Sequence, residues 1–434
     1  MDTIRWQPVP KIIHQKQLNQ HIILYRGSAD LINDKSTIRG KVIIKISWHP
    51  YPNVNFQFVY HSQEEKIDLD NQDNLELKLI DIIPQSRIKV YINSYQGWGN
   101  GKNQLSGYFI EPFIQGTTDP LFSVVFHITN FQFFNTSNLD EDDDGNINIL
   151  EGWLSFYGQF VFEYENWRFV LSTLDNCFEL QESLQTEGGY GVTHICLIEK
   201  LDHTQLNFNE AYEQIKAFVY YLSFARGLWI SPILVSGFDK DGDLLFEEWR
   251  TNPIIAGSSF KYDYSWADPD STELVLAFPG FMKKWNDEIW QGVIQNVIQW
   301  HIESLINQRN TSIILIQSSL EKLAWTFLKS NECLSADGFK SMKAADQIRL
   351  LLKFLDIDIE LLDEYSEISK KAKEMNWHDS LQAISEVRNA IVHPQVKKSK
   401  ASHFPSEEIL SEAFTIYHHY LEKCLLKLFD YPLY

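Results

Sequence analysis

Two side chains suited to phosphate chemistry lie five positions apart in this sequence, the guanidinium of Arg388 and the imidazole of His393. Residues 381–393 have the apolar spacing of a helix. With Ile384 placed at zero on a projection of about 100° per residue, Arg388 falls at about 40°, inside the apolar stripe. A guanidinium directed into such a stripe is costly unless an anion meets it. We therefore expect Arg388 to face a carboxylate, a phosphate or a partner subunit.

The residue after His393 is Pro394. Proline disfavours the α conformation for the residue before it, so the helix is expected to end at about Val392. On an uninterrupted helix Arg388 and His393 would diverge by about 140°. Breaking the helix at His393 frees its ring to turn back towards Arg388. Spacing and proline together can thus bring an imidazole and a guanidinium to one helix end, at an exposed edge of a helical bundle.

The segment Arg388-Asn389-x-x-x-His393 resembles the R-x4-6-H motif of HEPN ribonucleases, which often have a polar residue after the arginine. The resemblance covers roughly the last third of the chain, where helices are also expected at 310–329, 342–355 and 406–429. Residues 344–352 followed by 381–394 are similar to the Apea-like, abortive-infection type of HEPN domain. The resemblance implies an antiparallel bundle with the motif in its penultimate helix.

For function, the resemblance implies a metal-independent endoribonuclease that needs no cofactor. The RNA 2′-hydroxyl would attack the adjacent phosphate and leave a 2′,3′-cyclic phosphate and a 5′-hydroxyl. His393 would transfer protons, Arg388 would hold the phosphate as charge builds, and Asn389 would orient the imidazole or a phosphate oxygen. A two-fold homodimer would supply His393 from each copy. The expected setting is antiviral defence by abortive infection, or a toxin effector, controlled by a protein trigger at the N-terminal region.

Each of these features also has a structural interpretation. Arg388 can form a buried ion pair with Glu321 or Asp346, and His393 can cap its helix. The alternative for the whole protein is a catalytically inactive HEPN module that dimerises, with a ligand-binding β region.

A basic cluster follows the motif at Lys397, Lys398 and Lys400. In an acidic protein it could guide RNA to the site, or it could be a solvated loop.

An acidic loop from Asp140 to Glu151 matches the calcium-binding loop of an EF-hand at several ligand positions. Its flanks have strand character, whereas an EF-hand needs paired helices, so either a calcium site or an ordinary acidic turn is possible. Residues 239–243 indicate a tight turn between strands. The neighbours His418 and His419 lack the i, i+4 spacing of two ligands on a helix, and we predict no metal ligands.

The elements expected around these residues define an α+β multidomain protein. Residues 1–120 form a β-rich domain with strands at 42–48, 56–60 and 88–92. Residues 121–265 form a second β-rich domain and possible sensor, with a hairpin at 159–171 and one helix at 208–228. Residues 285–434 form the helical bundle, with helices beginning near 286 and at 310, 342, 365 and 406.

Composition limits the partners and the compartment. The chain has 434 residues, 38 basic and 58 acidic side chains and a formal charge of −20. Residues 301–434 carry roughly 16 basic and 19 acidic groups, so RNA contacts are expected only there. Four scattered cysteines and an N-terminus without an apolar leader favour the cytoplasm. The apolar run at 217–238 contains Arg226 and Pro232, so no membrane span is expected.

Overall fold

A computed structural model describes residues 15, 17–34, 36–61, 75–82, 87–98, 101–132, 139–141, 147–149, 159–174, 176–251, 257, 266–267, 273–331, 336–360, 365–393 and 405–432. The chain divides into two compact units. The first comprises residues 1–219, 229–263 and 269–271, and the second comprises 220–228, 264–268 and 272–434. The α+β organisation is confirmed, because the N-terminal region is rich in strands and the C-terminal region is helical.

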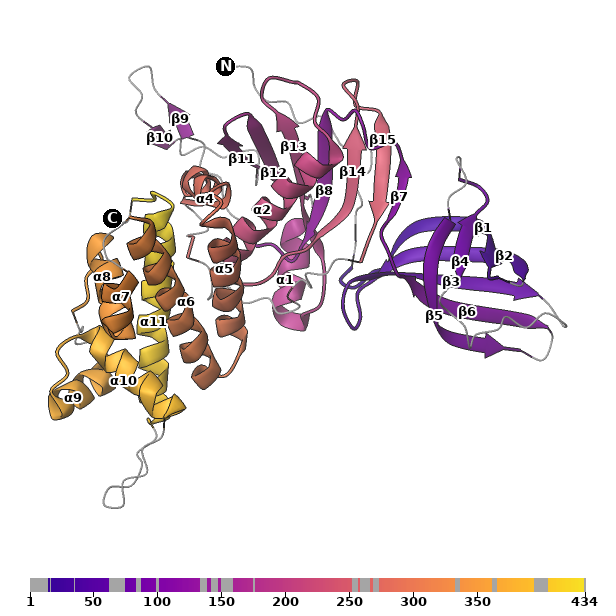
Figure 1. Ribbon diagram of the computed structural model, residues 1–434. Coiled ribbons are helices and arrows are strands. Elements are labelled where there is room, and N and C mark those ends of the chain that lie inside the picture. Colours follow the sequence, from indigo (N-terminus) through magenta and orange to yellow (C-terminus); the bar gives the residue numbers. More distant parts are fainter. Residues whose placement is uncertain are drawn as a thin grey trace. The chain divides into compact units, whose positions relative to one another are not determined.

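The first strands of unit 1 close into an antiparallel barrel in the order β1-β2-β3-β6-β5-β4 (Figure 1). Their bounds are β1 (Ile22–Ile32), β2 (Thr37–Ser47), β3 (Asn53–His61), β4 (Glu76–Leu79), β5 (Arg87–Gly97) and β6 (Lys102–Phe109). Side chains alternate in and out along β3, β4 and β6, so that β3 buries Val54, Phe56, Phe58 and Tyr60. The inward-facing apolar side chains of the six strands together form the core of the barrel.

A seven-stranded sheet follows in unit 1, in the order β11-β12-β13-β8-β14-β15-β7. Its strands are β7 (Phe113–Gly116), β8 (Ser123–Thr129), β11 (Gln159–Tyr164), β12 (Trp167–Thr173), β13 (Val192–Lys200), β14 (Pro232–Phe238) and β15 (Leu244–Trp249). The helices of this region are α1 (Cys177–Glu187) and α2 (Phe208–Arg226). Phe218 of α2 packs on Phe162 of β11 and Phe169 of β12, which covers one end of the sheet.

Two turns predicted from the sequence are confirmed. Tyr164 pairs with Trp167 across a hairpin turn in which Glu165 has a φ of 51°. Between β14 and β15, the carboxylate of Asp239 accepts hydrogen bonds from the backbone N–H groups of Asp241 and Asp243. Asp239 therefore stabilises a turn.

The acidic loop from Asp140 to Glu151 is only partly within the described residues. Two short strands, β9 (Leu139–Glu141) and β10 (Ile147–Ile149), pair antiparallel. Residues 142–146 and 150–151 lie outside the described part of the chain. The two interpretations of this loop, a calcium site and an ordinary acidic turn, are therefore not tested by the described residues.

Unit 2 is helical, and α6 and α11 are its longest helices. Its elements are α3 (Glu273–Leu276), α4 (Phe278–Trp285), α5 (Gln291–Ile306), α6 (Arg309–Ser330), α7 (Ala336–Ser341), α8 (Ala344–Phe354), α9 (Ser366–Met375), α10 (Ser380–Val392) and α11 (Glu407–Leu428). Helix α6 packs against α5, α8, α10 and α11. None of the helices within the described residues is long and apolar enough to cross a membrane.

Two helix boundaries differ from the prediction. The single helix expected from residue 365 to 392 is two helices, because Asn376 adopts a left-handed conformation with a φ of 55° after α9. Asp379 then caps α10 by accepting a hydrogen bond from the backbone N–H of Gln382. The helix expected near residue 286 begins at Gln291, since Asp287 caps the preceding turn.

Candidate phosphate-binding cleft in the helical unit

A polar cleft of about 750 Å³ lies in unit 2 beside Arg388. Helix α6 contributes Gln317 and Glu321, and the start of α8 contributes Lys343, Asp346 and Arg349. The remaining wall is the face of α10 from Gln382 to Asn389, together with His378 and Asp379 before the helix. Short polar side chains and alanines line the start of these helices, which leaves an open space.

Arg349, one of the basic side chains that line the cleft, is paired with two carboxylates. Its Nε and Nη2 donate to the two carboxylate oxygens of Asp379 over 2.8 and 3.1 Å, and its Nη1 donates to Asp346. Burial disfavours the charged form of Asp379, but hydrogen bonds from Arg349 and from the Gln382 N–H outweigh it and hold the pKa of Asp379 below its usual value. This pair fixes the start of α10 and leaves Arg349 little capacity for a ligand.

Arg388, which belongs to α10, also lines the cleft and is half-buried. No carboxylate of the described residues lies within 4.0 Å of the Arg388 guanidinium, the limit for an ion pair. Asp346 is paired with Arg349, and Glu321 accepts a hydrogen bond from the amide of Gln317 over 2.6 Å. Nη1 makes a long 3.5 Å contact to the amide oxygen of Asn389. The buried Nε has no hydrogen-bond partner among the described residues. The ion pair of Arg388 with Glu321 or Asp346 that we considered is therefore not formed.

Behind the cleft, Tyr417 of α11 is fully buried and donates a hydrogen bond to the amide oxygen of Gln317 over 2.7 Å. Burial raises the pKa of the Tyr417 hydroxyl, and a hydrogen bond with Ser385 and the positive charge of Arg388 oppose that rise. The Arg388 guanidinium thus lies beside a neutral hydroxyl and an amide.

The structure brings two of the three predicted catalytic side chains to the cleft, Arg388 and Asn389. His393 does not line it. It is the exposed residue that ends α10, and its backbone N–H donates to the carbonyl of Asn389 over 2.8 Å. Helix α10 ends at Val392 as predicted from Pro394. Lys397, Lys398 and Lys400 lie outside the described residues.

The apolar stripe of α10 is mostly used inside the unit. Ile384 and Val387 are buried in the core, which accounts for the position of Arg388 at the border of that core. Towards the end of the helix Ile391 is half-buried and Val392 is exposed. A second copy of the chain could therefore contact this end of α10 but not its middle.

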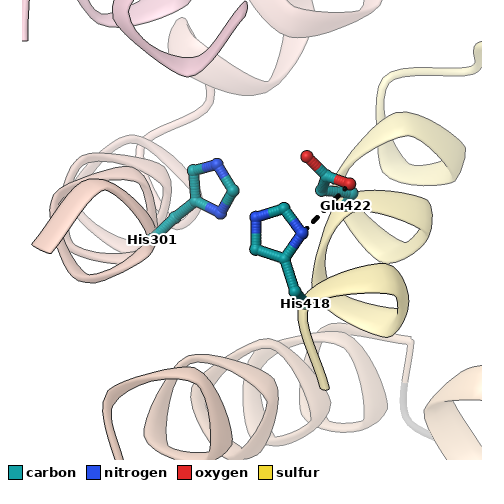
Figure 2. Close-up of side chains that lie close together, drawn as sticks. All are labelled: His301, His418 and Glu422. Atoms are coloured by element: carbon teal, nitrogen blue, oxygen red, sulfur yellow. Dashed lines mark ion pairs between the residues drawn. The ribbon is translucent and has the colours of Figure 1, made fainter. Parts of the chain in front are cut away.

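Another group of polar side chains, which we did not predict, lies between α5 and α11. His301 belongs to α5, and His418 and Glu422 belong to α11 (Figure 2). The sequence signal was the i, i+4 spacing of His418 and Glu422, which places both on one face of a helix. The prediction of no metal ligands considered only the pair His418 and His419, and no local pattern in the sequence links His301 to His418 and Glu422.

Comparison with known proteins gives two family matches, one in each unit. Residues 116–259 match the family model of the YopA central domain, and residues 287–432 match that of the YopA C-terminal domain. The first segment covers the seven-stranded sheet from β8 to β15, and the second runs from the turn before α5 to beyond α11. The sheet and the helical unit are thus each similar to a YopA domain.

A relative extends the similarity to most of the chain. The SPbeta prophage-derived uncharacterized protein YopA of Bacillus subtilis (strain 168) is 23% identical over 391 residues, which are 87% of this chain and 83% of the relative. No solved structure matches the chain.

The HEPN assignment is wrong. The families that match are YopA domains, and no HEPN family is found. The assignment depended on an arginine and a histidine at a loosely defined spacing, and a helix ended by a proline provides that pattern without common ancestry. Arg388 and His393 must be judged by their own chemistry.

Proposed function

We propose that the helical unit is a metal-independent endoribonuclease that holds a phosphate of RNA at Arg388 and transfers protons with His393. The observation that carries the proposal is the Arg388 guanidinium, which faces an open cleft without a carboxylate partner among the described residues. A half-buried cation in that position favours an anionic ligand, because the ligand would supply the missing acceptors.

The ligand class follows from the shape and charge of the cleft. A guanidinium presents forked donors that match two oxygens of a phosphate, and Asn389 adds an amide beside it. The cleft is lined by three basic side chains, Lys343, Arg349 and Arg388, and by four acidic ones, Glu321, Asp346, Asp379 and Glu386, so it suits one phosphate held at Arg388 and not a long polyanion. RNA provides such a phosphate, and its 2′-hydroxyl is a nucleophile within the same molecule that can attack it.

The reaction needs a group that can both accept and release a proton. An exposed imidazole at the end of α10 can take the 2′-hydroxyl proton as that oxygen attacks phosphorus, or can protonate the 5′-oxygen as the P–O5′ bond breaks. One imidazole cannot do both at the same moment, and His393 does not line the cleft of its own chain. We therefore propose a homodimer in which His393 of a second copy completes the site, through contacts at the exposed end of α10.

The test is RNA cleavage by the purified protein and three single variants. Arg388→Met and His393→Gln are expected to lose cleavage by at least about a hundredfold, since each removes a group that acts on the reacting phosphate. The matched control is Lys353→Met, which removes an exposed positive charge from α8 outside the cleft lining. If Arg388→Met cuts like the parent, or if Lys353→Met loses as much activity, the assignment is incorrect.

The setting that we propose is defence against phage or a toxin-type response. The relative's description as prophage-derived favours a role in conflict between phage and host. In such a setting cleavage of cellular RNA needs control, and the N-terminal β region would supply it by binding a protein trigger.

A second candidate function, an interaction module without catalysis, is favoured by the outer face of the barrel. Tyr91 of β5 and Tyr108 of β6 are both exposed, and their rings stack with centroids 5.2 Å apart. Exposed aromatic pairs are common at protein interfaces. A photo-crosslinking residue at position 108 should capture a discrete protein in cells, whereas one at the exposed Tyr51 should not. Equal capture at both positions would count against a specific surface.

A further inference from the structure

A cluster of two imidazoles and one carboxylate lies between α5 and α11, with His301 fully buried and His418 and Glu422 partly buried. The donor atoms of His301, His418 and Glu422 all lie within 4.8 Å of one another. Nδ1 of His418 is 3.4 Å from Oε2 of Glu422, and the rings of His301 and His418 stack with centroids 5.0 Å apart. Figure 2 shows the three side chains turned towards one another between the two helices.

Three of the four ring nitrogens of this cluster have no hydrogen-bond partner among the described residues. Both ring nitrogens of the fully buried His301 and Nε2 of His418 are inaccessible to solvent and make no hydrogen bond within the described part of the chain. A neutral imidazole has one donor and one acceptor, and buried polar atoms in folded proteins are nearly always paired. Unpaired nitrogens from two adjacent rings point to one missing partner between them.

The surroundings set the protonation of the cluster. Burial lowers the pKa of His301 well below its usual value and that of His418 to about 4, so both rings are neutral at pH 7 with free lone pairs. Burial raises the pKa of Glu422, because it disfavours the charged form of the carboxyl group. The aromatic rings of Phe224 and Phe414 pack on His301 and His418. A cation bound here would be shielded from bulk water.

We propose that His301, His418 and Glu422 bind one divalent transition-metal ion, with Zn²⁺ as the best fit. Two neutral imidazoles and a carboxylate are typical ligands of Zn²⁺. Bond lengths of about 2.0–2.1 Å in a tetrahedral site bring ligand atoms to about 3.3 Å from one another. The widest donor separation would therefore have to shrink by roughly 1.5 Å, which side-chain rotation can supply. A water molecule would complete the coordination.

The site is structural in this proposal. It ties α5 to α11, the helix that also carries Tyr417 behind the Arg388 cleft, and it is independent of the proposed RNA cleavage. A metal bound only by the folded chain raises the unfolding temperature as its concentration increases. Zinc bound only at these side chains should therefore stabilise unit 2 by an amount that grows with the logarithm of the free Zn²⁺ concentration above the dissociation constant.

The experiment is a titration of the chelator-treated full-length protein with Zn²⁺, and with Co²⁺ as a spectroscopic probe. We expect about one equivalent to bind, a rise in the unfolding temperature, and the visible absorption of four-coordinate Co²⁺ with nitrogen and oxygen ligands. His301→Phe and Glu422→Gln should remove all three effects. His419→Gln, which changes the exposed histidine next to His418, is the matched control and should retain them.

The phenylalanine variant also guards against loss of folding. It replaces a buried ring whose nitrogens are unpaired, so the metal-free variant should unfold at a temperature no lower than the metal-free parent. The proposal is overturned if the parent binds no Zn²⁺, which would leave an ordered water as the missing partner. Equal binding by His301→Phe, or loss of binding in His419→Gln, would overturn it as well. None of these results depends on whether the protein cuts RNA.

Discussion

The replacement Arg388→Met separates a ligand-binding arginine from a structural one. In the structure Arg388 has a buried Nε without an acceptor and no ion pair with a described carboxylate. An unsatisfied buried donor costs about 1–3 kcal/mol, and the lower end applies because the side chain is only half-buried. Methionine has nearly the same helix propensity and a similar length. We therefore expect the free energy of unfolding of the helical unit to stay the same or to rise by up to about 1 kcal/mol.

A buried ion pair would give the opposite result, since removing one partner of such a pair typically costs about 3–5 kcal/mol. Hydrogen exchange of the α10 amides, with urea unfolding of the full chain, measures the difference. The matched control is Arg349→Met, which removes both hydrogen bonds to Asp379 and should destabilise α10 by about 1–3 kcal/mol. A loss in Arg388→Met as large as in Arg349→Met would refute the reasoning.

Three further predictions concern the cap of α10, the basic cluster and assembly. Asp379→Ala should lower the free energy of unfolding in urea by at least as much as Arg349→Met, because it removes the cap as well as both acceptors of Arg349, whereas Asp379→Ser, which can still cap, should lose less. Because the pKa of Asp379 is lowered in the folded state, the stability that its charge contributes is fully present above the unfolded-state pKa of about 3.9 and is lost as the pH falls through the folded-state pKa. An acid unfolding profile of Asp379→Ser that equals the parent's would contradict this. Replacing Lys397, Lys398 and Lys400 together by alanine should make RNA binding less sensitive to salt. The slope of the logarithm of the binding constant against the logarithm of the salt concentration should decrease in size by about 0.7 for each phosphate that these lysines neutralise. An unchanged slope would show that the cluster does not contact RNA. Mixed under conditions that exchange subunits, the Arg388→Met and His393→Gln chains should regain part of the cleavage activity, and a strictly monomeric active protein by light scattering would exclude the composite site.

Local signals in the sequence predicted local structure well. Pro394 placed the end of α10 at Val392, and the helix expected from residue 406 is α11, which Ser406 caps by accepting from the N–H of Ile409. The hairpin at Glu165 and the turn at Asp239 were also found, because each depends on a few neighbouring residues. Such features are decided by short-range sterics and hydrogen bonds.

Long-range features were not accessible in the same way. The barrel closes through pairing of β3 with β6, strands separated by β4 and β5, and no local pattern encodes that choice. The break at Asn376 interrupts an amphipathic stretch whose spacing continues on both sides, so periodicity alone predicted one helix. His301 lies more than a hundred residues before His418, and only packing of α5 near α11 brings them together.

The candidate cleft stands between these cases. The position of Arg388 at the edge of an apolar stripe predicted that it needs an anionic partner, and the structure shows that the nearby carboxylates are engaged elsewhere. The family resemblance built on the same residue was wrong, since two residues at a loose spacing carry little information about descent. The surroundings of one side chain were therefore more informative than the pattern match.

Above all, we propose that Arg388 holds an RNA phosphate while the neighbouring 2′-hydroxyl attacks it. The most direct measurement uses a DNA oligonucleotide with one internal ribonucleotide, incubated with the protein in EDTA, followed by analysis of the product ends. We predict a single cut on the 3′ side of the ribonucleotide, with a 2′,3′-cyclic phosphate and a 5′-hydroxyl, and no cut by Arg388→Met. Cleavage at deoxyribonucleotides, products with 5′-phosphates, the same cut by Arg388→Met, or no cleavage of this substrate and of RNA would contradict the account.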